Sequence, residues 1–229
     1  MTTGSILQGS IGIGLAIISA PILLMVEPVL VPGPLLLCAV CLTAIVAFRE
    51  REFMDRSKIG WALVGRMPGT LVGLALLSAI PTQQTSVFLA GMLLFAVVLS
   101  GIGRAQWKPR PLSLTVAGCL SGIMGTTTSV GGPPMALLFV ESSGSALRGT
   151  LSGFFFVGAS VSSIGLALTG RLGWTELCWA ASLLPAVVLG TQLSRYTARI
   201  LARKGSRGAV LIASGTAATV ALVRSCFGY

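Results

Sequence analysis

The sequence contains no histidine, and only six of its 229 residues are acidic. Histidine is the commonest metal ligand and the usual general base near neutral pH, so its absence removes most metal sites and most acid–base mechanisms. No pair of carboxylates stands at a workable spacing, and no glycine-rich loop is followed by Lys-Ser or Lys-Thr. We therefore expect a protein that is not an enzyme and that holds no cofactor and no metal ion.

Cysteine is scarce as well, and its number is odd. All five cysteines lie in apolar segments: Cys38, Cys41, Cys119, Cys178 and Cys226. Two neighbouring thiols without a histidine make a poor metal site, so we interpret these residues as packing residues.

Charged residues make up only 10% of the chain, whereas 54% of the residues are hydrophobic. Soluble amphipathic helices need charged outer faces, but from Ile59 to Gly103 the only charged residue is Arg66. Apolar segments recur instead at roughly the length that crosses a bilayer core of about 30 Å. There are eight: 4–26, 29–48, 59–80, 85–103, 112–140, 147–169, 174–194 and 208–226. The pattern predicts an all-α polytopic membrane protein with one transmembrane domain, residues 1–229.

The net charge of +10 would suggest a nucleic-acid partner in a soluble protein. In a membrane protein it is explained by Lys and Arg gathered in cytoplasmic loops. We expect no nucleic-acid partner.

The segment from Gly118 to Val140 is broken in its middle by the run Gly-Gly-Pro-Pro. Unpaired backbone amides at membrane depth are costly unless they line a cavity or are buried in protein, so the break predicts a cavity or a ligand. A half-helix N-terminus beside hydroxyl groups suits an anion. The expected substrate-binding residues here are Thr126, Thr127, Thr128, Ser129, Gly131, Gly132, Pro133 and Pro134. We expect positive φ at Gly131 and Gly132, and Pro134 in the first turn of the second half-helix.

The chain shows an internal repeat of two four-segment halves, residues 1–105 and 106–229. A shift of 113 residues places Gly9 on Gly122, Gly12 on Gly125, Pro21 on Pro134 and Leu24 on Leu137. A shift of 117 places Pro68 on Pro185 and Gly73 on Gly190. Each half is expected to open with a broken or re-entrant helix whose elements are Gly9, Gly12, Gly14 and Pro21 in the first half and Gly122 and Gly125 in the second. Gly14, Gly73 and Gly190 are also expected to be close helix contacts.

The distribution of positive charge favours an inverted arrangement. If each opening segment enters the membrane and returns, six helices cross, and thirteen Lys and Arg residues share the cytoplasmic side: Arg49, Arg51, Arg56, Lys58, Arg104, Lys108, Arg110, Arg148, Arg195, Arg199, Arg203, Lys204 and Arg207. Only Arg171 and Arg224 then lie outside, as the positive-inside rule expects. The alternative is eight spans with one basic loop outside.

Arg66 is the one charge deep within an apolar segment, which makes it a candidate ligand for an anion. The alternative is that its side chain extends to the nearby cytoplasmic surface. Glu27 and Glu141 follow the two broken elements and are candidates for proton coupling, because burial raises the pKa of a carboxylate. The alternative for both is a solvated carboxylate at the end of a segment.

The run SGIMGTTTSVGGPPMALLF, followed by ALRGTLSGFFF, resembles the TauE/SafE family of sulfite and sulfonate exporters, as do the Pro-x-x-x-x-Gly pairs at Pro68/Gly73 and Pro185/Gly190. The resemblance covers nearly the whole chain, and it adds Arg148, at the start of the next helix, to the expected substrate-binding residues. One departure is the first half, which reads GIGLAIISAP where the family commonly has further glycines.

The resemblance implies a multi-pass protein of the bacterial cytoplasmic membrane that exports a small anion such as sulfite, a sulfonate or a related organic anion or oxyanion. The alternative is a non-transporting membrane subunit or scaffold protein. The expected partners are a small anionic substrate and the lipid bilayer, and a homodimer is left open.

Overall fold

A computed structural model describes residues 1–80, 82–101, 108–139 and 144–204. The regular elements of these residues are all helical. In chain order they are α1 Thr2–Ile11, α2 Leu15–Val26, η1 Pro28–Leu30, α3 Gly33–Arg49, η2 Arg51–Phe53, α4 Arg56–Ala79, α5 Thr82–Gly101, α6 Pro111–Thr128, α7 Gly132–Leu138, α8 Gly144–Leu168 and α9 Trp174–Lys204. The last predicted segment, 208–226, lies outside the described residues.

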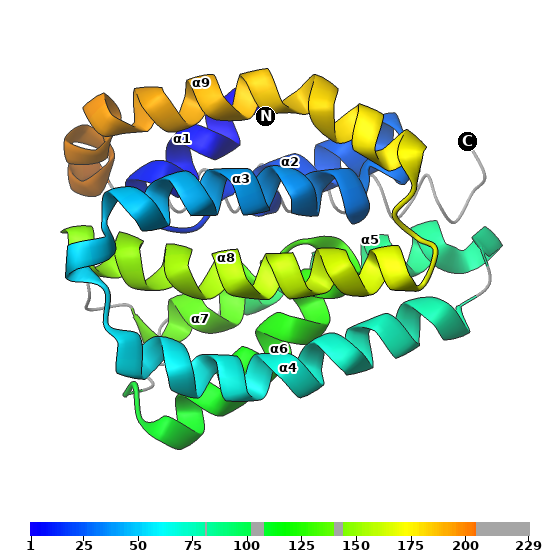
Figure 1. Cartoon of the computed structure of the whole chain (residues 1–229), viewed down its shortest axis with the longest axis horizontal. Helices are drawn as coiled ribbons and strands as arrows, with labels where there is room; N and C mark the ends of the chain where they lie inside the picture. The colour runs from blue at the N-terminus through cyan, green and yellow to red at the C-terminus, as the bar shows by residue number, and fades with distance from the viewer. Residues whose placement is uncertain (81, 102–107, 140–143, 205–229) are drawn as a thin grey trace.

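Within the residues that the structure describes, four stretches are long and apolar enough to cross a membrane: Pro28–Arg49, Arg56–Ala79, Gly144–Leu168 and Trp174–Tyr196. These stretches fall in α3, α4, α8 and α9, which lie side by side along the long axis of the molecule (Figure 1). They confirm the prediction of an all-helical, multi-pass membrane protein.

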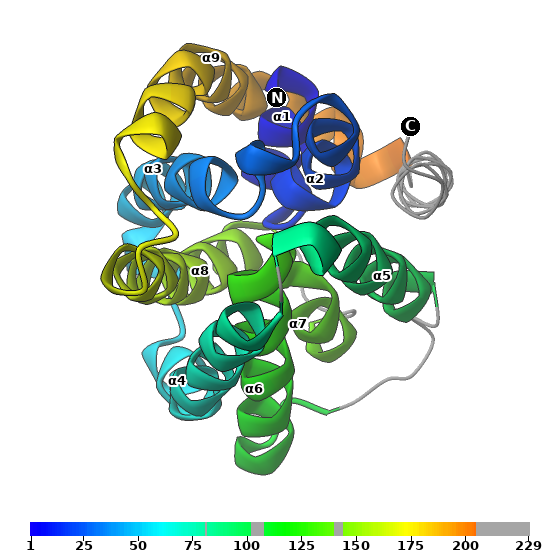
Figure 2. The same cartoon turned by 90° about the vertical axis from the view of Figure 1, so that its right-hand side faces the viewer.

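Both segments that the sequence predicted to be broken consist of two helices. The first is α1 followed by α2, with the break at Gly12–Gly14, and the second is α6 followed by α7, with the break at Ser129–Gly131. In Figure 2 the first pair lies with α3 and α9, and the second lies with α4 and α8.

Helices α4, α6 and α8 all start at the same end of the molecule. Ala62 of α4 faces Gly118 of α6, and further along Gly73 faces Thr126, so these two helices run parallel. Between α4 and α8, Ile59 faces Gly153 and Leu74 faces Gly165, in the same order. Because α6 and α8 begin at the same end, the chain between them must return there, and α7 is the described part of that return (Figure 1).

Helices α1, α3 and α9 run in the opposite direction. A Cβ on Gly33, at the start of α3, would meet Glu176 near the start of α9, and Gly190 faces Thr2 of α1 whereas Gly9 faces Ser194. The two groups are joined by the sharp reversal between α3 and α4. The reversal ends at Asp55, the N-cap of α4, whose carboxylate accepts a hydrogen bond from the backbone amide of Lys58.

Glycine allows α4 and α6 to approach closely. A Cβ on Gly65 or Gly69 of α4, or on Gly118 of α6, would overlap the backbone of the facing helix. Small residues are what membrane helices use to bring their backbones together. Gly73 and Gly190 make similar close contacts, which confirms their predicted packing role.

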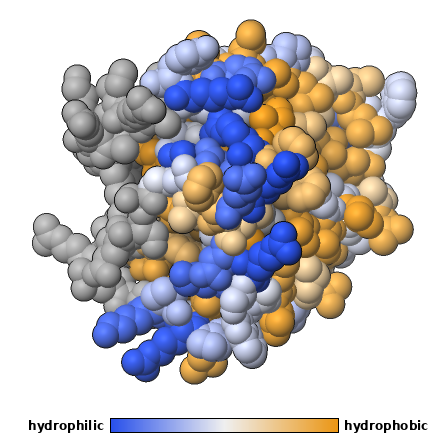
Figure 3. All heavy atoms as spheres, turned by 60° about the vertical axis from the view of Figure 1, so that its left-hand side comes forward, coloured by the Kyte–Doolittle hydropathy of each residue, from blue (hydrophilic) through white to orange (hydrophobic). Residues whose placement is uncertain are grey.

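Eight of the described basic residues gather at one end of the molecule, which we call the basic end: Arg49, Arg51, Arg56, Lys58, Lys108, Arg110, Arg148 and Arg195. Figure 3 shows this end as the hydrophilic part of an otherwise largely hydrophobic surface. Arg171 lies at the other end, where its side chain donates to the carbonyl of Leu77.

Candidate functional site

The side chain of Arg66 points into the protein. Arg66 is 2% exposed, and its Nη1 donates to the hydroxyl of Ser121 at 2.8 Å and to the carbonyl of the same residue at 3.4 Å. Its guanidinium lies over the ring of Phe154, 5.0 Å from the centroid, and 5.9 Å from that of Phe155. Arg66 therefore does not extend to the surface, as the alternative interpretation required.

The guanidinium fits only because glycines surround it. A Cβ on Gly158 would overlap Nε, one on Gly125 would lie 2.9 Å from Nη2, and one on Gly131 would lie 3.2 Å from Nη1. These glycines come from α8, α6 and the second break, so three elements leave room for one side chain.

Within the described ranges, Arg66 forms no ion pair, and its Nε has no hydrogen-bond partner. Arginine keeps its proton in proteins, so the side chain carries a full positive charge that no neighbouring carboxylate balances. A buried charge without a partner is expensive, and an anion would offset that cost.

A cavity of about 30 Å³ adjoins the guanidinium. The first break contributes Ile13 and Gly14 to its wall, and the second contributes Ser129, Val130 and Gly131. Other lining residues are Gln8, Leu15, Ala16, Ile17, Leu36, Ala39, Gly132, Phe155 and Ala159. The cavity is therefore small in this conformation.

The two breaks share a left-handed residue at the end of the first helix, but they differ at the start of the second, where Gly14 has φ of 142° and Gly131 has φ of −86°. Gly12 and Ser129 are both left-handed, with φ of 93° and 66°, and each caps the helix before it, whereas Gly14 and Gly131 cap the helices that follow. Gly12 and Ser129 lie 117 residues apart, as Gly14 and Gly131 do.

This separation equals the predicted shift of 117 between Pro68 and Pro185. It differs by four residues, about one helical turn, from the shift of 113 predicted for the opening segments. The internal repeat itself stays a prediction.

Two predictions about the second break have different outcomes. Positive φ at Gly131 and Gly132 is wrong, because Gly131 has φ of −86° and the left-handed residue is Ser129. Pro134 does lie in the first turn of α7, next to Pro133, and both are buried. Ser129 is stabilised in its unusual conformation by its hydroxyl, which donates to the carbonyl of Pro32 at 2.9 Å.

The three threonines, Thr126 to Thr128, directly precede the cavity-lining residue Ser129 in the sequence, but they do not line the cavity themselves. Thr127 and Thr128 donate to carbonyls one turn earlier in α6, and the hydroxyl of Thr126 pairs with that of Ser162 in α8 at 2.8 Å. Of the four predicted hydroxyl residues, only Ser129 lines the cavity.

The remaining predicted break residues lie inside helices. Gly122 and Gly125 belong to α6, where a Cβ would meet the backbone or side chain of Arg66. Gly9 lies in α1 against Ser194, and Pro21 is buried within α2.

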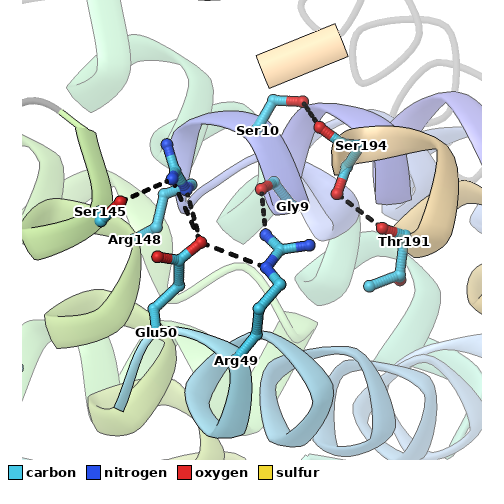
Figure 4. Close-up of polar contacts among 8 residues, drawn as sticks. All are labelled: Gly9, Ser10, Arg49, Glu50, Ser145, Arg148, Thr191 and Ser194. Atoms are coloured by element: carbon cyan, nitrogen blue, oxygen red, sulfur yellow. Dashed lines mark hydrogen bonds and ion pairs between the residues drawn. The ribbon is translucent and has the colours of Figure 1, made fainter. Parts of the chain in front are cut away.

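Arg148 lies at the basic end, in an ion-pair network that the sequence did not predict (Figure 4). Its Nη2 donates to Glu50 at 3.1 Å and to Ser145 at 3.1 Å. Glu50 also accepts from Arg49 at 3.2 Å, and Arg49 donates to the carbonyl of Gly9 at 3.1 Å. Glu50 is only 7% exposed, so this carboxylate ties α1, α3 and α8 together.

The two candidate coupling residues have no tested role. Glu27 is exposed at the end of α2, as its solvated alternative requires, and Glu141 lies outside the described residues. Coupling through either remains a prediction.

The model of one protein family, described as "Sulfite exporter TauE/SafE", matches residues 1–221, nearly the whole chain. The chain belongs to the TauE/SafE sulfite exporter family. Comparisons with curated proteins and with solved structures gave no match. Membership of the TauE/SafE family makes the protein a membrane transporter of the sulfite and anion exporter class.

Sequence reasoning found Arg66 in this TauE/SafE protein but missed three residues that hold it: Ser121, Phe154 and Gly158. Each is more than fifty positions away in the chain, and each is an ordinary residue of an apolar helix. No local signal marks them, because only the parallel packing of α4, α6 and α8 brings them to Arg66.

Proposed function

We propose that the protein exports a small oxyanion, such as sulfite or a sulfonate, and that Arg66 binds it in the cavity between the two breaks. The observation that carries the proposal is a buried arginine without a carboxylate, beside a cavity that both broken segments line. A planar guanidinium presents paired donors that match two oxygens of an oxyanion.

The backbone of the second break supplies further groups to the proposed site. Gly131 and Gly132 line the cavity at the start of α7, and Ser129 lines it at the end of α6. Thr126, Thr127, Thr128, Pro133 and Pro134 shape the break in this proposal and do not contact the anion, because their polar atoms are used within the protein or they line no part of the cavity. Arg148 acts at the basic end, apart from the anion.

We further propose that the halves are inverted repeats and that α6 and α7 form a re-entrant pair. The opposite directions of the two helix groups support the inversion, as does the left-handed residue that ends the first helix of each break. The common starting end of α6 and α8 supports the re-entrant path. Broken helices that meet near the membrane midplane are a recurrent transporter design.

In this proposal the basic end faces the cytoplasm of a bacterial cell, across its cytoplasmic membrane. An interior-negative potential then favours outward movement of an anion by about 2.3 kcal/mol per charge per 100 mV, so export needs no ATPase.

Orientation is tested by labelling single cysteines in a cysteine-free background. Ser57 lies at the basic end and Thr169 at the other end, and both are exposed. A membrane-impermeant thiol reagent added to intact cells should label Ser57→Cys only after the cells are opened, and Thr169→Cys before. Labelling of both from outside would contradict the proposed orientation.

Flux is the decisive experiment. Purified protein in liposomes should release trapped sulfite faster than protein-free liposomes, and an outside-positive potential should increase the rate. A panel of sulfonates and organic anions in the same assay would rank the substrates. Absence of flux for every anion would favour the non-transporting scaffold instead, and the size of the protein in detergent would show whether it is a homodimer.

A further inference from the structure

A second hollow lies at the basic end, far larger than the cavity beside Arg66. Its volume is about 690 Å³, and three arginines line it: Arg49 and Arg51 at the end of α3 and in η2, and Arg195 from α9. One acidic residue, Glu52, shares the wall. The hollow therefore has an excess of positive charge and is open enough to admit a bulky group.

Two of these arginines are held in place by the protein. Arg49 donates through Nε to Glu50 and through Nη2 to the carbonyl of Gly9 (Figure 4), which leaves Nη1 without an acceptor among the described residues. The guanidinium of Arg51 lies over the ring of Phe48, 4.7 Å from its centroid. Arginines that are already ordered lose less side-chain entropy when they bind an anion.

The rest of the wall is apolar. Ala44, Ile45 and Phe48 line it, and they belong to a helix that is apolar and long enough to span the membrane. Phe48 is 72% exposed, and Tyr196, next to Arg195 on α9, is 79% exposed. Exposed aromatic residues near the ends of spanning helices are typical of the membrane–water interface, so the hollow lies at the depth of lipid headgroups.

We propose that this hollow binds an anionic phospholipid, with its phosphate between Arg49, Arg51 and Arg195 and an acyl chain along Ala44 and Ile45. A free inorganic anion would use the arginines and leave the apolar wall unused, whereas a phospholipid uses both. Basic pockets between membrane helices are known to hold lipid headgroups. The site is separate from the proposed transport cavity, and the lipid bound there would lie between α3 and α9.

The test measures retention of lipid by the purified full-length protein in detergent, by native mass spectrometry. Phosphatidylglycerol should be retained by the wild type, and phosphatidylcholine with the same acyl chains should not. The variant is the double substitution Arg51→Gln with Arg195→Gln, which leaves Arg49 and its bond to Glu50 intact. We expect at least a tenfold loss of bound phosphatidylglycerol.

The matched control is Arg56→Gln with Arg110→Gln. It removes the same charge from exposed residues of the same end, outside the hollow, and it should retain phosphatidylglycerol as the wild type does. Equal loss in the control, no loss in the double variant, or equal retention of phosphatidylcholine by the wild type would each overturn the proposal.

A thermal-stability assay with inorganic phosphate and with phosphatidylglycerol distinguishes a free phosphate ion from the phosphate of a lipid headgroup as the occupant. Stabilisation by phosphate equal to that by the lipid would overturn the lipid assignment. If the double variant lacks the helical circular dichroism of the wild type, the single variant Arg51→Gln is measured instead, and an unchanged lipid content would overturn the proposal.

Discussion

The first broken segment turns at Gly12–Gly14 and the second at Ser129–Gly131, and in both a left-handed residue ends the first helix. Their surroundings differ. In the first, the amide of Leu15 donates to the side-chain oxygen of Gln8 at 2.9 Å. In the second, Ser121 donates to the carbonyl of Gly131 at 2.6 Å and accepts from Arg66. The first break is therefore hydrogen-bonded to the neutral side-chain amide of Gln8, whereas the second is connected through Ser121 to the positive charge of Arg66.

The comparison extends to the helices behind the breaks. The shift of 117 residues that relates the breaks relates Arg66 to Leu183, so the first half supplies a charge that the second half lacks. Both breaks interrupt a helix, whereas only the second adjoins the charge to which we assign the substrate. Because both breaks line the same cavity, one arginine is sufficient for a single anion.

The largest expected effect comes from substitution of Arg66, because the substitution removes the charge that distinguishes the two halves. Arg66→Met should abolish sulfite flux, since both the charge and the donors are lost, while the protein still inserts because a desolvation cost disappears as well. Arg66→Lys keeps the charge without the paired donors, so flux should weaken but survive. Flux in liposomes and anion affinity in detergent measure both variants.

Arg110→Met, an exposed arginine at the basic end, is the control and should behave as the wild type. If Arg66 does not bind the anion, wild type, Lys and Met should have affinities within about twofold, roughly 0.4 kcal/mol. That result would remove Arg66 from the site.

The second effect separates two neighbouring glycines of the second break. A Cβ on Gly131 would lie 2.8 Å from the hydroxyl of Ser121 and 2.9 Å from its carbonyl, so Gly131→Ala should displace the group that holds Arg66. A Cβ on Gly132 would lie no closer than 3.4 Å to Ile13, an ordinary contact. We expect at least tenfold weaker anion affinity for Gly131→Ala and near-normal affinity for Gly132→Ala.

Equal losses in these two variants would show that the break tolerates no side chain at all. Equal retention would show that the contact of Gly131 with Ser121 is unimportant for the anion.

A third and smaller effect concerns the first break, where substitution should affect stability more than binding. Gly14 has φ of 142°, and a Cβ there would lie 2.7 Å from Leu7, so Gly14→Ala should cost about 1–3 kcal/mol of folding free energy. The atoms nearest that Cβ all belong to Leu7 and not to Arg66, so the anion affinity of the folded fraction should stay within about twofold. Thermal unfolding and anion affinity, measured on one preparation, compare the effect on stability with the effect on binding. A tenfold loss of affinity would make the first break an equal partner in binding.

The smallest effect distinguishes strain from hydrogen bonding at Ser129. Ser129→Gly loses the hydrogen bond to Pro32 but relieves the left-handed conformation, and the two terms, each about 1 kcal/mol, should nearly cancel. Ser129→Ala loses the bond and keeps the strain, so it should be the less stable variant by about 1 kcal/mol in thermal unfolding. An equal loss in both would mean that the conformation carries no strain.

The sequence alone was enough to predict what depends on local pattern. Apolar length predicted the membrane helices, and the run of glycine and proline predicted the break in the segment from Gly118 to Val140. The rarity of intramembrane charge identified Arg66. Each of these signals lies within about twenty consecutive residues, where composition and conformation are directly linked.

What the sequence could not predict depends on which helices meet. The hydroxyls of Thr126 to Thr128 are polar groups near a break, and nothing local reveals that they bond within α6 or to α8. Glu50 belongs to a charged run that reads as a solvated loop, yet it is buried because α8 brings Arg148 over it.

In the proposed transport cycle, the missing counter-ion of Arg66 determines which step responds to the membrane potential. Within the described part of the chain no carboxylate balances it, so the empty site carries one positive charge and a site holding a monovalent anion carries none. The loaded site then crosses the membrane field without electrical work, and the empty site returns inward as a cation, down the field of an interior-negative cell. The membrane potential would therefore drive the return step of the cycle, and turnover would depend on voltage through the empty carrier.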